Sequence, residues 1–422
     1  MERKHSSSNE RSAECLSTFF MQLSQLYFDK ARELVEKEKD AVRPGPCRQL
    51  LTLLPNLVVV EKSYVELAFV SMKNKIFLRK DNSLRSLYES FRSDLNKLED
   101  GDDFVTKISE HLNEHAAARI LLIDLYERMY TIGSSNKAVK ASELLVMINA
   151  IQPFSCRLEI IAPFIASFSL EYDILKNLLQ ALSELQSWQF LPCLTHLHFS
   201  NTHLTTWEKN LQNRESWKLG FGASFLKGNQ TPALCQWLVK LKYAIVAKFS
   251  LYFHSVLVQQ TTGPDMRTIC SKHNIDHMHK IHSLQRKHDA ICVVLVLDAT
   301  GGDAELLSSG PGYQHPERAV EPLDQFTVML SYPVKPKDQL PTITKALSER
   351  RAELSTLEVI CIYCVKEKYT YFMSLVDPRV TLVVVFDSKK DDRETSIKNN
   401  ISELCAQLRW NRVFALLKLN NK

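Results

Sequence analysis

From about residue 13 to residue 282, apolar residues recur every three or four positions along the chain. This spacing places the apolar side chains on one face of an α-helix. The three clearest apolar stripes are Val105, Ile108, Leu112, Ala116, Ile120 and Ile123; Leu170, Ile174, Leu178, Leu182 and Leu185; and Trp237, Leu241, Ile245, Phe249 and Phe253. Turn-forming residues at positions 43–46, 100–103 and 133–136 separate the helical segments. The pattern therefore predicts a helical bundle.

The pattern changes near Asp289. Residues 291–297 (ICVVLVL) and 380–386 (VTLVVVF) are short, continuous apolar runs rich in β-branched side chains. Seven residues are few for a buried helix but suit a strand that is covered on both faces. Further strands are predicted at residues 325–332, 357–365 and 369–376, and helices at residues 340–354 and 391–408. The predicted order is strand, strand, helix, strand, strand, strand, helix, which a single sheet with helices on its face buries most simply.

The predicted fold class is therefore α+β: an N-terminal all-α helical bundle followed by a C-terminal α/β domain. The element order of the second domain matches that of longin, roadblock and profilin-like domains, which is a fold-level analogy. Residues 1–12 are polar and are predicted to be disordered. The predicted division is a bundle over residues 13–283 and an α/β longin/roadblock/profilin-like domain over residues 284–422.

Composition adds few constraints. The 422 residues are 45% hydrophobic and 24% charged, with a formal net charge of +5 and no long block of either sign. This balance predicts a globular protein without a nucleic-acid partner. The N-terminus lacks the apolar core of a signal peptide, so the ten cysteines are expected to stay reduced in an intracellular protein. The best membrane-span candidate, residues 244–258, contains Lys248 and His254 and is too short, so no span is predicted.

A histidine cluster is the strongest candidate for chemistry. His273, His277, His279, His282 and His288 fall close together, with Cys270 and Asp276 beside them. His273 and His277 are four residues apart, so on a helix they would share a face, as zinc ligands do. Asn274 follows His273 where a zinc protease has glutamate, and no third ligand is obvious. Two interpretations remain open: a metal-dependent enzyme that uses His273 and His277, or a solvated polar face at an interdomain joint.

Other candidate sites have simpler explanations. Cys361 and Cys364 form a lone CxxC on a predicted strand, where residues three apart point to opposite faces, so two core thiols are predicted. The glycines of residues 301–312 lie in a long loop that leads to a strand and lacks the lysine of a phosphate-binding loop. His254 and Asp265 have no nucleophile beside them, and no Ser-centred elbow or kinase motif is present. The sequence thus predicts no catalytic, cofactor-binding or metal-binding residue.

Two further groups of side chains have open alternatives. Trp188, Trp207 and Trp217 are expected to pack in the core and the joint, and a ligand cage is the alternative. Three lysines (Lys240, Lys242 and Lys248) follow the third apolar stripe and are interpreted as side chains that snorkel at the edge of a core helix. The alternative is contact with anionic lipid headgroups.

Many segments along the chain resemble one family. They are residues 27–31 (YFDKA), 35–38 (VEKE), 79–81 (RKD), 84–85 (LR), 125–130 (LYERMY), 188–192 (WQFLP), 204–207 (LTTW), 237–242 (WLVKLK), 247–250 (AKFS), 252–254 (YFH), 260–262 (QTT), 312–313 (GY), 315–316 (HP) and 386–390 (FDSKK). In number and order they resemble the family of the bridging KICSTOR subunit (the KICSTOR subunit two family). The spacing of residues 301–314 differs from the family. None of these segments is a catalytic motif.

The resemblance implies a non-catalytic scaffold without a cofactor. It implies kaptin-like, FG-GAP-repeat and very large seizure-threshold proteins as partners, and recruitment of the GATOR GTPase-activating assembly, with an indirect link to Rag GTPases. The implied location is cytoplasmic and peripheral on the lysosomal membrane, where the complex restrains TOR complex one when amino acids are scarce. By analogy with longin platforms, direct binding of a small GTPase by the C-terminal domain is a further alternative. The sequence assigns no interface residue.

Overall fold

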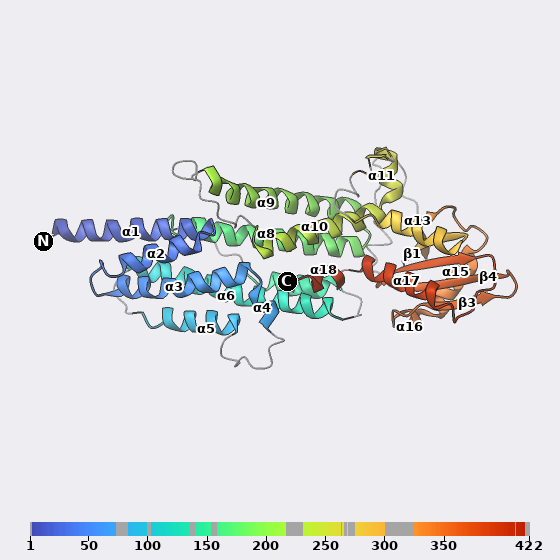
Figure 1. Ribbon diagram of the computed structural model, residues 1–422, viewed down its shortest axis with the longest axis horizontal. Helices are drawn as coiled ribbons and strands as arrows, with labels where there is room; N and C mark the ends of the chain where they lie inside the picture. The colour runs from blue at the N-terminus through green and yellow to red at the C-terminus, as the bar shows by residue number, and fades with distance from the viewer. Residues whose placement is uncertain are drawn as a thin grey trace.

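The computed structural model describes residues 2–72, 83–98, 103–135, 140–152, 158–216, 231–262, 264–265, 268, 275–299, 325–409 and 411–417. The helices that precede the sheet are α1 (Glu2–Ser24), α2 (Phe28–Glu38), α3 (Pro46–Val65), α4 (Ala68–Met72), α5 (Leu84–Leu95), α6 (Asp103–Gly133), α7 (Ala141–Asn149), α8 (Ala162–Gln186), α9 (Phe190–Ser216), α10 (Ala233–Tyr252), α11 (His254–Gln260) and α13 (His277–His288). The bundle helices run along the long axis of the molecule, and the sheet lies at one end (Figure 1).

The three apolar stripes lie in α6, α8 and α10. All their residues are buried except Leu170, which is partly buried, so the helical prediction is confirmed. The expected helix ends are also present. Gly45 takes a φ of 154°, in the region that favours glycine, and Pro46 occupies the first turn of α3. Helix α6 ends at Gly133, at the start of the predicted turn.

The N-terminus differs from the expectation. Residues 2–12 were predicted to be disordered, but they lie within α1. Ser12, Leu16 and Phe19 are buried, and α1 packs against α2 and α8. Arg11 also forms an ion pair with Glu38 of α2 at 2.7 Å. The helix that carries Leu16 and Phe19 into the core thus extends through the polar segment that precedes it.

The sheet contains five antiparallel strands in the order β2-β1-β5-β4-β3. They are β1 (Cys292–Asp298), β2 (Phe326–Tyr332), β3 (Ile360–Cys364), β4 (Tyr369–Asp377) and β5 (Val380–Phe386), and the helices among and after them are α15 (Leu340–Glu349), α16 (Arg351–Leu354), α17 (Thr395–Leu408) and α18 (Asn411–Ala415). The predicted order of strands and helices is therefore confirmed. The helix expected over residues 340–354 is two helices, and the helix expected from residue 391 begins at Thr395.

The central strands are buried on both faces, as their apolar runs predicted. Every residue of β5 is buried, and so is every residue of β1 before Asp298. Alternate side chains point to different cores, because successive residues of a strand face opposite sides. Val294 and Val296 pack with α15 and α16, whereas Val293 and Leu295 belong to the core that includes α13 and α17. The helices thus cover the sheet on both sides.

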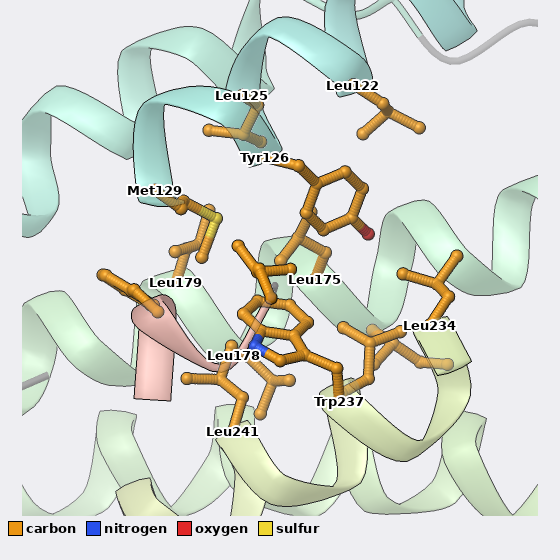
Figure 2. Close-up of a cluster of buried hydrophobic side chains, with 14 of the residues drawn as sticks. Leu122, Leu125, Tyr126, Met129, Leu175, Leu178, Leu179, Leu234, Trp237 and Leu241 are labelled. Carbon is orange, nitrogen blue, oxygen red and sulfur yellow. The ribbon is translucent and has the colours of Figure 1, made fainter. Parts of the chain in front are cut away.

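One of these two cores is continuous with the bundle. The apolar cluster that contains Val293 and Ile401 of the sheet half also contains the stripes of α6, α8 and α10. Helix α18 follows the sheet in sequence but packs against α6 and α10. Trp237 of α10 lies in one buried cluster with Leu125 of α6 and Leu178 of α8, as Figure 2 shows, and its Nε1 donates a hydrogen bond to the Val413 carbonyl at 2.9 Å. The end of the chain therefore stabilises the bundle.

Two features bear on the predicted domain division. Helix α13 runs through residues 283 and 284, where the boundary was placed, and it packs on β1, β2 and α17. Helix α18 lies beyond that boundary but contacts the bundle. Within the described ranges, no helix combines the length and the apolar character needed to cross a bilayer.

Candidate functional site

A buried cluster of charged side chains lies inside the bundle. Arg119 of α6 pairs with Glu61 of α3 at 3.1 Å and with Glu171 of α8. The Nε2 atom of His115 lies 2.7 Å from a Glu61 carboxylate oxygen. All four residues are buried. Two carboxylates therefore share one guanidinium in the buried interior of the bundle, which requires that each be well bonded.

Three tyrosines complete the hydrogen bonding of the two carboxylates. Tyr88 donates to Glu61 at 2.8 Å, and Tyr64 and Tyr126 donate to Glu171 at 2.6 and 3.0 Å. Burial would raise the pKa of Glu61, but Arg119 and His115 outweigh it and lower that pKa to about 2. Glu61 is thus ionised, and both carboxylates are bonded on several sides. This arrangement holds α3, α5, α6 and α8 together.

A second buried ion pair connects the bundle to the sheet. The Lys248 ammonium of α10 lies 2.5 Å from the Asp377 carboxylate at the end of β4, and Tyr252 donates to the same oxygen at 2.5 Å. Arg409, which follows α17, donates to the Leu375 carbonyl of β4. We call the contact formed by these five residues the joint. Burial lowers the pKa of Lys248, and Asp377 opposes that shift.

The contacts of the joint correct the interpretation of Lys248, one of the three lysines beside the third apolar stripe. Lys248 was expected to snorkel or to face lipid, but its side chain is 1% exposed and pairs with Asp377. The sequence pattern around Lys248 does not show a partner that lies so far along the chain. Lys242 is half-buried and donates to Asn201 at 2.9 Å, and Lys240 is exposed.

A cavity of about 570 Å³ lies beside the joint. Its walls come from α10, α11, α13 and Tyr332 of β2. The lining residues include His254 of α11 and His277, His279 and His282 of α13. Part of the predicted histidine cluster is therefore gathered around one cavity. His254, which the sequence associated with Asp265, belongs to this group, whereas the Asp265 carboxylate accepts a hydrogen bond from Thr262.

Three histidines of the cavity, His254, His277 and His282, are held in their neutral forms. Burial lowers the pKa of His277 to about 3, with smaller contributions from Lys280 and Lys248. Burial also lowers the pKa of His254 and of His282. The His282 ring stacks on Tyr332 with the centroids 3.8 Å apart. At neutral pH these three imidazoles are therefore uncharged.

The metal interpretation has no support in the described residues. His273 and Cys270 lie outside them, so the pair of His273 and His277 is not described. Across the stretches that the structure covers, no three His, Cys, Asp or Glu side chains are arranged to hold a metal ion. His288 lies apart from the cavity and bonds to Asn400 of α17 at 2.7 Å.

The cysteine prediction is confirmed, and the tryptophan prediction is confirmed for two of its three residues. Cys361 packs against the core shared with the bundle, and Cys364 packs against the core under α15, so the two thiols point to opposite faces of β3. Trp188 stacks on Phe253, and Trp207 is buried in the bundle core. Trp217 and the glycines of residues 301–312 lie outside the described residues.

Comparison with known proteins gives a consistent result over the whole chain. The family model described as "KICSTOR complex C12orf66 like" matches residues 4–422. The chain is 34% identical over 434 residues to the protein named "KICSTOR subunit 2" from Danio rerio, and 34% identical over 432 residues to the protein of that name from Xenopus laevis. Each alignment covers 96% of this chain and 96% of the relative.

Replacing Arg119 with methionine should destabilise the bundle strongly. Arg119→Met leaves Glu61 and Glu171 buried without a cation, and we expect a loss of about 3–5 kcal/mol in the free energy of unfolding. Urea unfolding at pH 7 measures this loss of stability. The matched control is Arg85→Met, because Arg85 pairs with Glu89 and Asp124 at the surface and its loss should cost less than about 1 kcal/mol. Equal losses in the two variants would contradict a buried network.

A double-mutant cycle tests the joint. Lys248→Met and Asp377→Leu should each cost about 3–5 kcal/mol, because each leaves the opposite charge buried alone. The double variant should be more stable, by at least about 2 kcal/mol, than the sum of the two single losses predicts. The same cycle at the exposed pair of Lys62 and Asp29 serves as the control and should give a coupling below about 1 kcal/mol. Additive losses at the joint would disprove the coupling.

His277 should make the stability of the protein sensitive to acid. Its folded pKa of about 3 lies below the ordinary value of 6.5, so between these values the unfolded chain binds a proton that the folded chain does not. Stability therefore falls as pH falls below 6.5. When the pH is lowered from 7.5 to 5.5, the free energy of unfolding of the wild type should fall by about 1.4 kcal/mol more than that of His277→Leu.

Urea unfolding at the two pH values measures this difference. His279→Leu changes an exposed histidine of the same helix and should retain the pH dependence of the wild type. If His277→Leu and the wild type lose the same free energy on acidification, a buried neutral His277 is ruled out.

Proposed function

The chain belongs to the KICSTOR complex C12orf66-like family, and from this membership we propose that it is a non-catalytic scaffold and adaptor subunit of a KICSTOR-like complex. The observation that carries the proposal is the alignment with "KICSTOR subunit 2" proteins over nearly the whole length of both chains. The aligned extent covers the bundle and the sheet half alike, which supports a role that uses both halves.

The structure supports a bridging role through its joint. An adaptor that connects two partners needs docking surfaces in a fixed spatial relation. The buried pair of Lys248 and Asp377, together with a core that runs from the bundle to one face of the sheet, provides a rigid connection. Large apolar side chains remain exposed on both halves, among them Leu191 and Phe199 of α9 and Val365 after β3.

The family membership also supports a specific set of partners. We infer that the chain connects kaptin-like and FG-GAP-repeat proteins to a very large seizure-threshold protein. The assembled complex recruits the GATOR GTPase-activating assembly to lysosomes and thereby acts on Rag GTPases indirectly. Its effect is to restrain TOR complex one when amino acids are scarce. The chain reaches the lysosomal membrane through its partners.

We further propose that the sheet half is a longin/roadblock/profilin-like unit. The support is the order of two strands, a helical segment, three strands and a final helix around one antiparallel sheet. The proposed division is the bundle over residues 13–283 and this unit over residues 284–422; α1 extends the bundle to Glu2, α13 crosses the boundary, and α18 returns to the bundle. As a platform of this kind, the unit presents a surface for protein partners.

Capture of partners in cells that lack the chain tests the bridging role. When the kaptin-like protein is captured from such cells, the very large seizure-threshold protein should no longer be recovered with it, because the chain that bridges the two proteins is missing. Re-expression of the wild type should restore the recovery, as should Arg85→Met, whose change lies at the surface. Mass spectrometry quantifies both proteins.

TOR complex one activity in starved cells provides a second readout of the same variants. The cells that lack the chain should keep this kinase active without amino acids, and re-expression should restore its shut-off. Undiminished recovery of the very large protein without the chain would refute the bridging role.

A further inference from the structure

The cavity beside the joint has the size and position of a ligand site. Its volume of about 570 Å³ lies within the range of roughly 300–1,000 Å³ that small-molecule sites occupy. It lies where the bundle, through α10 and α11, meets α13 and the sheet, and such boundaries are a common place for ligand sites. One part of its lining is apolar, with Leu251, Val258 and Met278. This part can cover the hydrocarbon body of a ligand.

Two imidazoles of the lining keep a nitrogen without a partner. The Nδ1 atom of His277 and the Nε2 atom of His282 are buried, and neither has a hydrogen-bond partner among the residues that the structure describes. His277 is 6% exposed. A buried polar atom without a partner is unfavourable, and native structures rarely leave one without a reason. The two nitrogens make one side of the cavity wall polar.

The charges of the lining indicate the sign of that ligand. Asp276 is already engaged, because its carboxylate caps α13 by accepting a hydrogen bond from the His279 amide at 2.9 Å. Arg286 forms no ion pair with a described residue. His282 and Arg286 are four residues apart on α13 and therefore lie on the same face of the helix. Arg286 thus offers its guanidinium to an anionic group beside the ring of His282.

We propose that this cavity binds a small amphiphilic carboxylic acid. The carboxylate is held by Arg286, beside the His282 ring that stacks on Tyr332. The guanidinium pairs with the carboxylate as a charge-assisted donor. The hydrocarbon body lies against Leu251, Val258 and Met278. This site is separate from the bridging role, so either proposal can fail without the other.

Binding of decanoate to the purified full chain, measured by isothermal titration calorimetry, tests the site. We expect one saturable site with a Kd on the order of 100 µM. Decylamine, which has the same chain length and the opposite charge, should not bind. Arg286→Glu should weaken decanoate binding by about tenfold or more, because it reverses the charge that holds the carboxylate.

Lys287→Glu is the matched control. It makes the same charge change at the adjacent exposed residue, which does not line the cavity, and should alter the affinity by less than about twofold. Val258→Trp, at a position that is 43% exposed, should fill the cavity and abolish binding without disturbing the core. Circular dichroism and thermal unfolding establish that each variant is folded. The proposal is overturned if decanoate does not bind, if decylamine binds as well, or if Arg286→Glu or Val258→Trp binds decanoate as the wild type does.

Discussion

The buried ion pair between Lys248 and Asp377 determines how the two halves of the molecule are placed. Removing two charges from water is unfavourable unless both are held at short distance and bonded on their remaining sides. The pair meets this condition only when α10 and the end of β4 adopt one relative position, with Tyr252 on the same carboxylate. Apolar packing alone tolerates small displacements, whereas a buried charge does not. The joint therefore gives the continuous core a defined geometry.

The cluster around Arg119 applies the same constraint inside the bundle. Helices with broad apolar faces can pack in several registers, because leucine and isoleucine contacts are non-directional. The carboxylates of Glu61 and Glu171 must reach one guanidinium, which fixes α3 and α8 against α6. We interpret both buried charge clusters as devices that select one arrangement of helices. For a subunit that presents surfaces to several partners, a single arrangement matters more than added stability.

The sequence predicted local elements well because their signals are local. The stripes of α6, α8 and α10 and the apolar runs of β1 and β5 follow directly from residue spacing. The charge clusters were missed because each partner lies far along the chain. A local signal was nevertheless present: Lys248 and Arg119 lie three or four residues from neighbours on an apolar stripe, where an exposed charge is not expected. The return of α18 to the bundle and the start of α1 at Glu2 also depend on tertiary contacts that spacing does not encode.

The histidines show how the same spacing rule can lead to different chemistry. A separation of four residues first pointed to His273 and His277 as zinc ligands. Within the described residues, the informative pair with this separation is His282 and Arg286, which combine an uncharged imidazole with a fixed positive charge and so favour an anion. Because the cavity is lined by α10, α11, α13 and β2, a molecule bound there contacts both halves of the protein. Binding would then stabilise the joint by mass action, since the site exists only while the halves are together. A ligand in this cavity would thus act on the geometry that the buried ion pair maintains.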